Sequence, residues 1–397
     1  MKHLRLVLLT AATLATARTY AQDAAPTTPP AVAAPVAPAF PPYSGPLSAN
    51  ARPFGFDTPL SHVVVSGAAT GVGVFTSYPG AFGSSEPSSR ADIANGQVFV
   101  QTTTGIVQFA VQAGIYSLPA LGAPYLKATR ATDLIFGPVP QAFIRIVPNG
   151  EWTITGGLIP TLYGSEYTFT FQNQNIERGL LWAQEPAISR GVQAGYAKGK
   201  IAINVSLNDG FYSDKLNWLV GSFAYTIDPK NSFSVVAGGN IDRTGSFRSQ
   251  APPANNNGEL YNFIYMYKTG PWTVNPYFQY ARTHVIPAIG LIARAESIGG
   301  ALLVNRTFKR GFSIAARGEY EKSYVHGADD APNLFGYGAR ADAFSLTLTP
   351  AVQMGPLFLR ADVSYTGIGN VDPGLGFGSS FDHNQQYRSV IEAGVLF

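Results

Sequence analysis

Cysteine is absent from this chain of 397 residues, so its fold forms without disulfide bonds. Charged residues are scarce as well: Asp, Glu, Lys and Arg make up 13% of the sequence, against roughly 25% in typical soluble proteins. Beyond residue 21, no run approaches the roughly 18 consecutive apolar residues that a transmembrane helix needs. These absences exclude a disulfide-bonded scaffold and a helical membrane protein, and they argue against an ordinary soluble domain.

Signatures of enzymes and metal sites are also missing. The sequence contains no G-x-S-x-G, H-E-x-x-H or G-x-x-x-x-G-K-[ST] motif. Its histidines beyond residue 21 are His62, His284, His326 and His383, and their spacing does not match that of a metal site. A hydrolase would need a positioned nucleophile and base, which we cannot assign here. We therefore expect no catalytic residues, no metal and no cofactor.

Residues 1–21 have the pattern of a secretory signal peptide. Lys2 and Arg5 precede a short apolar run over residues 6–15, and a cleavage site at Thr19-Tyr20-Ala21 follows just before Gln22. The run is too short to span a membrane. We predict export, with a retained membrane anchor as the alternative.

Removal of this segment changes the charge balance. The 27 basic residues fall to 24 without Lys2, Arg5 and Arg18, which equals the 24 acidic residues. Binding to nucleic acid requires an excess of cationic side chains. The balanced charge therefore argues against a nucleic-acid partner.

Residues 22–60 are rich in proline and alanine. Such a composition favours extended polyproline II structure and does not form a packed core. We predict a semi-rigid periplasmic linker. A plug or a cell-wall tether is the alternative.

From about residue 62, apolar and polar residues alternate with a period of two, which predicts β-strands. In one example, Phe312 and Ile314 share one face, whereas Arg317 and Glu319 share the other. Sixteen segments show the pattern, at residues 62–77, 95–104, 106–117, 139–147, 151–159, 187–197, 200–208, 217–227, 231–240, 259–269, 271–281, 291–307, 311–321, 342–354, 356–366 and 386–397.

The connections between these segments alternate between short turns and long loops, the longest of which covers residues 160–186. A transmembrane barrel requires this sorting, because tight turns lie on one side of the membrane and long loops on the other. A soluble β-sandwich has no reason for it. We therefore predict an all-β fold over residues 61–397: a transmembrane antiparallel β-barrel of about 16 strands, with short periplasmic turns and long extracellular loops.

The last strand predicts which face meets lipid. Tyr387, Ile391 and Phe397 fall on an apolar face, and Arg388 and Glu392 fall on the opposite face. We expect the apolar face to contact outer-membrane lipid and the charged face to line the lumen. Five aromatic residues close to short turns or the chain end are predicted to form an interfacial girdle: Trp152, Phe233, Trp272, Phe312 and Phe397.

Two stretches carry a family resemblance together with the final strand: "ERGLLWAQEPAISRGVQAGY" (residues 177–196) and "NDGFYSDKLNWLVGSFAYTIDPKNSF" (residues 208–233). They resemble bacterial outer-membrane porins, specifically the OmpL-like β-barrel porins, over most of residues 95–397. The resemblance implies a channel in the outer membrane of a Gram-negative bacterium. It also implies that the barrel-assembly machinery binds the strand ending in Phe397, and that the barrels form a homotrimer.

In sixteen-stranded general porins the third long loop folds into the barrel and narrows it, so the resemblance to porins implies that role for residues 160–186. The loop has a net charge of −2 and supplies the constriction candidates Glu166, Glu177, Arg178 and Glu185. The lumen candidates from the wall are Arg145, Glu151, Arg317, Glu319, Glu321, Arg360, Asp362, Arg388 and Glu392. Opposed charges across a constriction would orient dipolar solutes. The alternative is that these groups pair with one another and fill a polar lumen.

Two functions follow from these features. The first is a passive diffusion channel for small hydrophilic solutes or ions, with weak selectivity, because a barrel of this size is too wide for wall side chains to fill. The second is an adhesin or receptor that binds a partner through its long loops while the lumen stays blocked. A barrel-embedded enzyme is disfavoured by the missing motifs.

Overall fold

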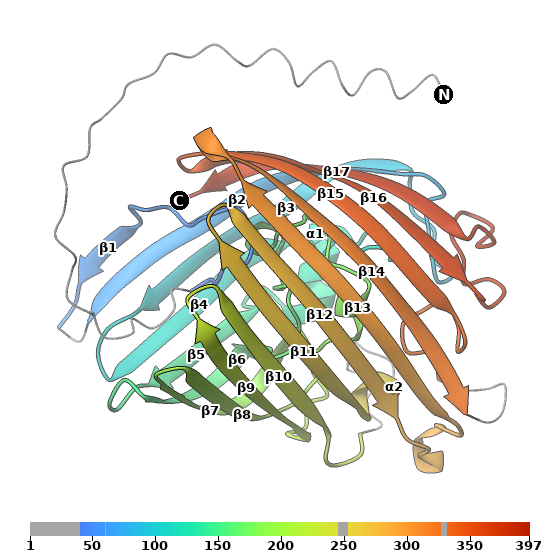
Figure 1. Cartoon of the computed structure of the whole chain (residues 1–397), viewed down its shortest axis with the longest axis horizontal. Helices are drawn as coiled ribbons and strands as arrows, with labels where there is room; N and C mark the ends of the chain where they lie inside the picture. Colours follow the sequence, from blue (N-terminus) through green and yellow to red (C-terminus); the bar gives the residue numbers. More distant parts are fainter. Residues whose placement is uncertain (1–39, 60, 245–252, 327–331) are drawn as a thin grey trace, which may run out of the picture. The chain divides into compact units, whose positions relative to one another are not determined.

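The computed structural model describes residues 40–59, 61–244, 253–326 and 332–397. Strands β2 to β17 form an antiparallel sheet in which each strand is hydrogen-bonded to the next along the chain, and β17 pairs with β2 (Figure 1). The sheet is therefore a closed barrel of sixteen strands, which confirms the predicted fold class. The predicted signal peptide, residues 1–21, and residues 22–39 of the predicted linker lie outside the described residues.

The barrel strands match the sixteen predicted segments. They are β2 (His62–Thr76), β3 (Ser89–Thr102), β4 (Val107–Tyr116), β5 (Gln141–Ile146), β6 (Trp152–Pro160), β7 (Ile188–Lys198), β8 (Ile201–Asn208), β9 (Trp218–Asp228), β10 (Asn231–Asn240), β11 (Gly258–Thr269), β12 (Trp272–Thr283), β13 (Arg294–Thr307), β14 (Phe312–His326), β15 (Asp342–Met354), β16 (Leu357–Gly369) and β17 (Gln385–Leu396).

Two of these strands extend well beyond the predicted bounds. Strand β3 begins at Ser89 rather than residue 95, because Arg90 and Asp92 continue the alternation on the inner face. Asp92 accepts hydrogen bonds from the Tyr125 hydroxyl and the Ala128 backbone N–H, at 3.2 and 2.8 Å. Strand β14 continues to His326 rather than residue 321, paired with β13 along its whole length. The extension of β3 therefore keeps the alternation of the wall, with Arg90 and Asp92 on the inner face and Ala91 and Ile93 on the outer face.

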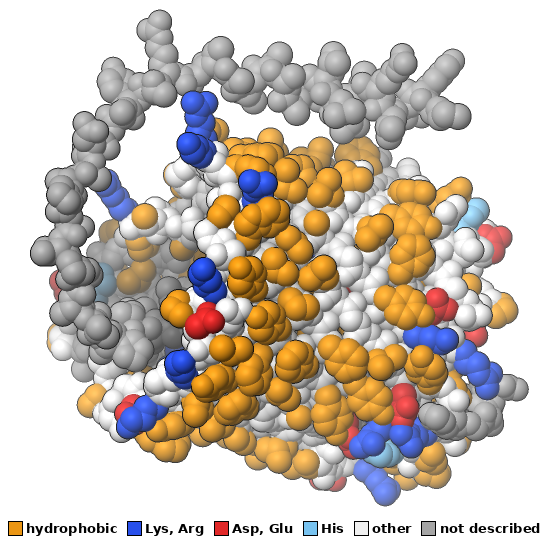
Figure 2. All heavy atoms as spheres, viewed as in Figure 1, with side chains coloured by type: hydrophobic (Ala, Val, Ile, Leu, Met, Phe, Trp, Pro, Cys, Tyr) orange, Lys and Arg blue, Asp and Glu red, His pale blue; other side chains and the backbone are white. Residues whose placement is uncertain are grey.

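The two faces of the wall differ in polarity. On β15, Phe344, Leu346 and Leu348 are 42 to 60% exposed, whereas the intervening Ser345 and Thr347 are buried inside the barrel. Figure 2 shows hydrophobic side chains spread over the outer face of the strands, with most charged side chains toward the strand ends. The apolar outer face and polar inner face match the predicted alternation.

Short and long connections are sorted to opposite ends of the barrel (Figure 1). The short ones cover residues 103–106, 147–151, 199–200, 229–230, 270–271, 308–311 and 355–356. The long connections hold α1 (Ala128–Ala131), a π-helical turn (Thr132–Phe136), α2 (Pro253–Asn256) and single 3₁₀ turns. Among the described residues, no helix has the length and apolar character needed to cross a membrane.

The barrel seam includes a strand that the sequence analysis missed, β1 (Phe54–Asp57). Strand β17 pairs with β2 only from Thr76 to Ala68, after which Gly67 and Phe397 exchange two backbone hydrogen bonds, at 2.7 and 3.0 Å. Beyond that point β1 takes over the same edge of β2 and pairs with residues 62–65. An open strand edge invites pairing with other chains, and β1 covers the edge that β17 leaves.

A substitution at Gly67 tests the close packing of the barrel seam. The Phe397 ring and the Gln97 carbonyl oxygen occupy the space that a side chain at Gly67 would need. We expect Gly67→Val to destabilise the barrel by about 1–3 kcal/mol through overpacking. The measurement is the temperature at which the folded band is lost in semi-native electrophoresis. Gly71→Val on the same strand is the matched control, because a Cβ at this position would meet only the Asp92 carbonyl oxygen, at 3.8 Å. Equal melting temperatures for the two variants would contradict the prediction.

Candidate functional site: the lumen and its internal loop

The connection from β6 to β7, residues 161–187, folds into the barrel, and most of its side chains are buried. We call it the lumen loop. The start and end of the loop lie close together. Gly164 and Glu185 are so near each other that a side chain at Gly164 would collide with the Glu185 carboxylate. Gly164 also has a φ of 78°, a conformation that side chains disfavour. Between these points the loop crosses to the wall formed by β14, β16 and β17.

Wall carboxylates hold the backbone of the lumen loop. Asp362 on β16 accepts hydrogen bonds from the N–H groups of Ile176 and Glu177, at 2.8 and 3.0 Å. Glu319 on β14 accepts one from the N–H of Leu180, at 3.1 Å. Buried backbone groups without partners are costly. The inward carboxylates therefore make it possible for an irregular segment to lie inside the barrel.

Three inward arginines, on β14, β16 and β17, form ion pairs in which no side chain is more than 7% exposed. Arg317 pairs with Glu166 at 2.5 Å and Glu319 at 3.1 Å, Arg360 with Glu392 at 2.7 Å, and Arg388 with Glu177 at 2.9 Å and Glu86 at 3.1 Å. Two of these partners, Glu166 and Glu177, belong to the lumen loop. The pairs therefore fasten the loop to the wall by charge as well as by backbone hydrogen bonds.

Two charged residues of the lumen loop lie outside these pairs. The Arg178 guanidinium is buried 5.2 Å from the Trp182 ring centre, and burial lowers its pKa to about 10, so that it stays charged near neutral pH. Burial raises the pKa of the Glu185 carboxyl to about 8, although a hydrogen bond from the Tyr277 hydroxyl opposes the rise. Burial likewise raises the pKa of Glu166, against the attraction of Arg317.

The remaining lumen candidates occupy different places. Glu321 on β14 is fully buried and has no ion-pair partner within the described part of the chain. Arg145 on β5 lies 5.4 Å from the Phe143 ring centre, beside a cavity of about 260 Å³. Glu151 is not part of the lumen cluster: it lies in the turn before β6 and pairs with Lys198 at 2.9 Å. The strand begins one residue later than predicted, because Asn149 Oδ1 accepts hydrogen bonds from the first backbone N–H groups.

The five predicted girdle residues lie near the short-turn end of the barrel. Trp152, Trp272, Phe312 and Phe397 are 38 to 50% exposed on the outer face, and Phe233 is partly exposed. Further aromatic rings lie beside them, such as Tyr196, whose ring centre is 4.7 Å from that of Trp152.

The family model described as "Putative beta-barrel porin-2, OmpL-like" matches residues 65–397 of the chain. The chain belongs to this family. It is a β-barrel porin of the Gram-negative outer membrane, and its family and fold indicate a channel rather than an enzyme. No curated protein sequence matches it.

Solved structures with the same fold are distant in sequence. OmpT of Vibrio cholerae, folded in vitro, has a TM-score of 0.56 and 12% identity, covering 86% of this porin and 99% of that chain. The channel DcaP of Acinetobacter baumannii has a TM-score of 0.56 and 11% identity, covering 86% and 99%. An anion-selective porin of Comamonas acidovorans has a TM-score of 0.53 and 10% identity, covering 84% and 99%. At such identities the likeness shows the fold alone.

Several polar residues of this porin's lumen were missed from the sequence. Thr170 in the lumen loop donates to Glu392 at 2.6 Å, and Gln279 on β12 donates to the Leu181 carbonyl at 2.9 Å. The alternation of β12 places Gln279 on the inner face, which is a signal that could have identified it. Glu86 lies in a loop without periodicity, so the sequence pattern does not indicate its ion pair with Arg388. Among the described residues, no group of three His, Cys, Asp or Glu side chains could hold a metal ion.

The pair of Arg360 and Glu392 tests how much the buried charges contribute to stability. We expect Arg360→Met to lower the free energy of unfolding by about 3–5 kcal/mol, because it leaves Glu392 buried without its partner. The double variant Arg360→Met/Glu392→Gln should recover part of that loss. Equilibrium unfolding in urea from lipid vesicles measures both, with Arg306→Met, an exposed arginine at the short-turn rim, as the control. Single and double variants of equal stability would show that the pair is not coupled.

Proposed function

We propose that this porin is a passive diffusion channel for small hydrophilic solutes, in which the lumen loop forms the constriction. The charged middle of the loop, residues 166–178, lies next to β14, β16 and β17, whereas its start and end contact β9 to β13. On the opposite wall, the inward side chains near the short turns are small and uncharged. Gln193, Asn204, Ser222 and Ser234, on β7 to β10, are only partly buried. This polar, incompletely covered strip is the observation that carries the proposal, since a water-filled path needs such a lining.

A vestibule at the long-loop end supports the same function. A cavity of about 750 Å³ lies there, and its lining includes Leu180 and Ala183 of the lumen loop together with residues 289–291 and 332–337. The lumen loop thus borders the cavity through which a solute would enter from outside. A pore of mixed lumen charge is expected to select only weakly between ions.

The outer surface supports a membrane-embedded barrel. We propose that the exposed apolar side chains contact outer-membrane lipid, with the aromatic residues of the short-turn end at one interface. The strand that ends at Phe397 closes the seam, which fits the proposal that the assembly machinery binds it. An adhesin or receptor remains the competing function and requires a blocked lumen.

Single-channel recording in a planar bilayer is the direct test of the channel. We expect discrete, long-lived, ohmic current steps from the folded protein, because the uncharged strip leaves a path beside the lumen loop. Polyethylene glycols of graded size, added to the bath, would measure the width of the constriction through the smallest polymer that is excluded. A barrel that is folded by circular dichroism and yet gives no steps would contradict the channel and favour the adhesin.

The pKa of Glu185 predicts a pH dependence of ion selectivity. With a pKa of about 8, the carboxyl is mainly neutral at pH 7 and mainly ionised at pH 9. Ionisation adds a negative charge to the lumen, so the preference for cations should rise across this range. The reversal potential in a KCl gradient measures the preference.

Glu185→Gln should abolish the change in reversal potential between pH 7 and pH 9. Glu151→Gln is the matched control, because Glu151 lies at the rim and pairs with Lys198. A pH response that is the same in both variants would contradict the assignment to Glu185.

A further inference from the structure

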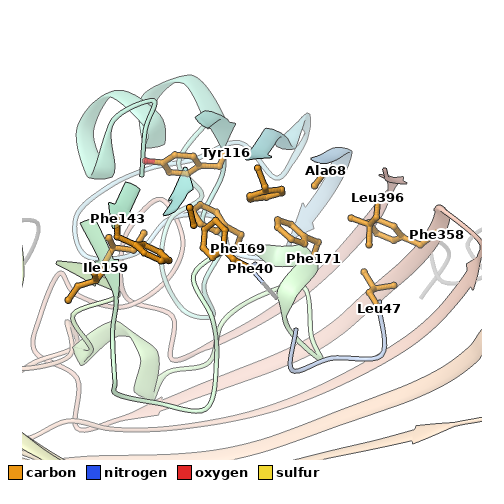
Figure 3. Packing of buried hydrophobic residues seen from close by; sticks show 13 residues of the cluster. Phe40, Leu47, Ala68, Tyr116, Phe143, Ile159, Phe169, Phe171, Phe358 and Leu396 are labelled. Atoms are coloured by element: carbon orange, nitrogen blue, oxygen red, sulfur yellow. The ribbon is translucent and has the colours of Figure 1, made fainter. Parts of the chain in front are cut away.

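Residues 40–48, which belong to the predicted linker, lie inside the barrel at its short-turn end; we call them the plug segment. Phe40 is 7% exposed, and its ring meets those of Phe99 and Phe143 edge-on, with ring centres 5.9 and 5.6 Å apart. Figure 3 shows Phe40 beside Phe143 and Phe169. The Gln101 side chain binds the Phe40 backbone twice, accepting from its N–H at 2.9 Å and donating to its carbonyl oxygen.

The wall and loop around the plug segment are apolar where a water-filled lumen would be polar. Phe99, Phe143 and Phe358 point inward and are at most 8% exposed. They belong to one buried cluster with Phe40, Leu47 and Phe171 of the lumen loop (Figure 3). Without the plug segment this apolar surface would face the water of the lumen, which is unfavourable. The plug segment therefore accounts for the inward phenylalanines, because it covers their side chains and keeps them away from water.

The plug segment is bonded to the lumen loop as well as to the wall. Gln172 accepts hydrogen bonds from the N–H groups of Ser44 and Gly45, at 2.8 and 3.3 Å, and donates to the Pro42 carbonyl at 3.1 Å. Gly45 approaches the loop so closely that a side chain there would collide with the Asn173 carbonyl. The loop conformation around Gln172 thus depends on the plug segment.

The far end of the plug segment is fastened to the short-turn rim. Gln353, beside the turn between β15 and β16, accepts from the Ser48 N–H and donates to the Ser48 carbonyl, both at 2.9 Å. The segment therefore extends from this rim to the wall of β3 and β5. Phe40 and Pro42 also line the cavity of about 260 Å³ beside Arg145.

We propose that the plug segment is a built-in obstruction at the periplasmic end of the pore, which fixes the lumen loop and narrows the exit for solutes. Its displacement gives a wider pore with a more mobile lumen loop. This inference rests on the proposed channel function. It assigns control of the width of the periplasmic exit to residues 40–48 together with the lumen loop.

Conductance of the full-length chain is the first test. Phe40→Ser/Leu47→Ser removes the two buried anchors of the plug segment and should shift the main conductance level upward, with noisier open states because the lumen loop loses its contacts. Phe54→Ser is the matched control, because this ring is 68% exposed on β1. An unchanged conductance in a folded double variant would overturn the proposal.

Cysteine labelling tests whether the plug segment is docked inside the barrel, and it does not require a conductance measurement. The chain has no cysteine, so Leu47→Cys places a single thiol at a buried position of the plug segment, and Ala51→Cys places one at an exposed position just beyond it. A maleimide should label L47C much more slowly than A51C in the folded protein, and Phe40→Ser should remove the difference. Equal rates in the unmodified background would overturn the proposal. Protection of L47C in a barrel that does not conduct would refute the channel and leave the docked segment intact.

Discussion

An irregular peptide segment can stay inside a β-barrel only where its backbone N–H and C=O groups find partners. In this porin the wall provides them from inward charged side chains. Asp362 binds two N–H groups of the lumen loop, and Arg360 donates to the Asn173 carbonyl at 2.9 Å. The same arginine pairs with Glu392, so its charge is satisfied at the same time. The position of the loop, and with it the shape of the pore, depends on these bonds.

The period-two pattern predicted most of the wall. Because alternate residues of a strand point to opposite faces, the sequence places Arg317, Arg360 and Arg388 inside without any knowledge of their partners. Pairing between strands then depends on register, which brings Arg360 directly opposite Glu392. Register between two strands cannot be read from either strand alone, so the sequence predicts a charged lumen but not its pairs.

The parts that sequence reasoning missed depend on tertiary contacts. Residues 22–60 have the composition of an extended linker, and nothing in that pattern distinguishes Phe40 or Leu47 as buried residues. Both are buried only because inward phenylalanines of distant strands surround them. Strand β1 forms for a similar reason: β17 ends before β2 does, so an edge remains for Phe54–Asp57 to cover. The composition of residues 22–60 indicates only how the segment would behave in isolation. The contacts that order its described part come from the barrel.

The lumen is asymmetric, and this bears on selectivity. Arg317, Arg360 and Arg388 are engaged with carboxylates on the side where the charged part of the lumen loop lies, whereas the opposite wall carries small uncharged side chains near the short turns. Paired charges produce only a weak field at a distance, because the two signs largely cancel. The charges that hold the loop therefore contribute little to the field along the open side. Any marked preference between ions therefore comes from lumen groups outside these ion pairs, chiefly Arg145, Arg178 and Glu185.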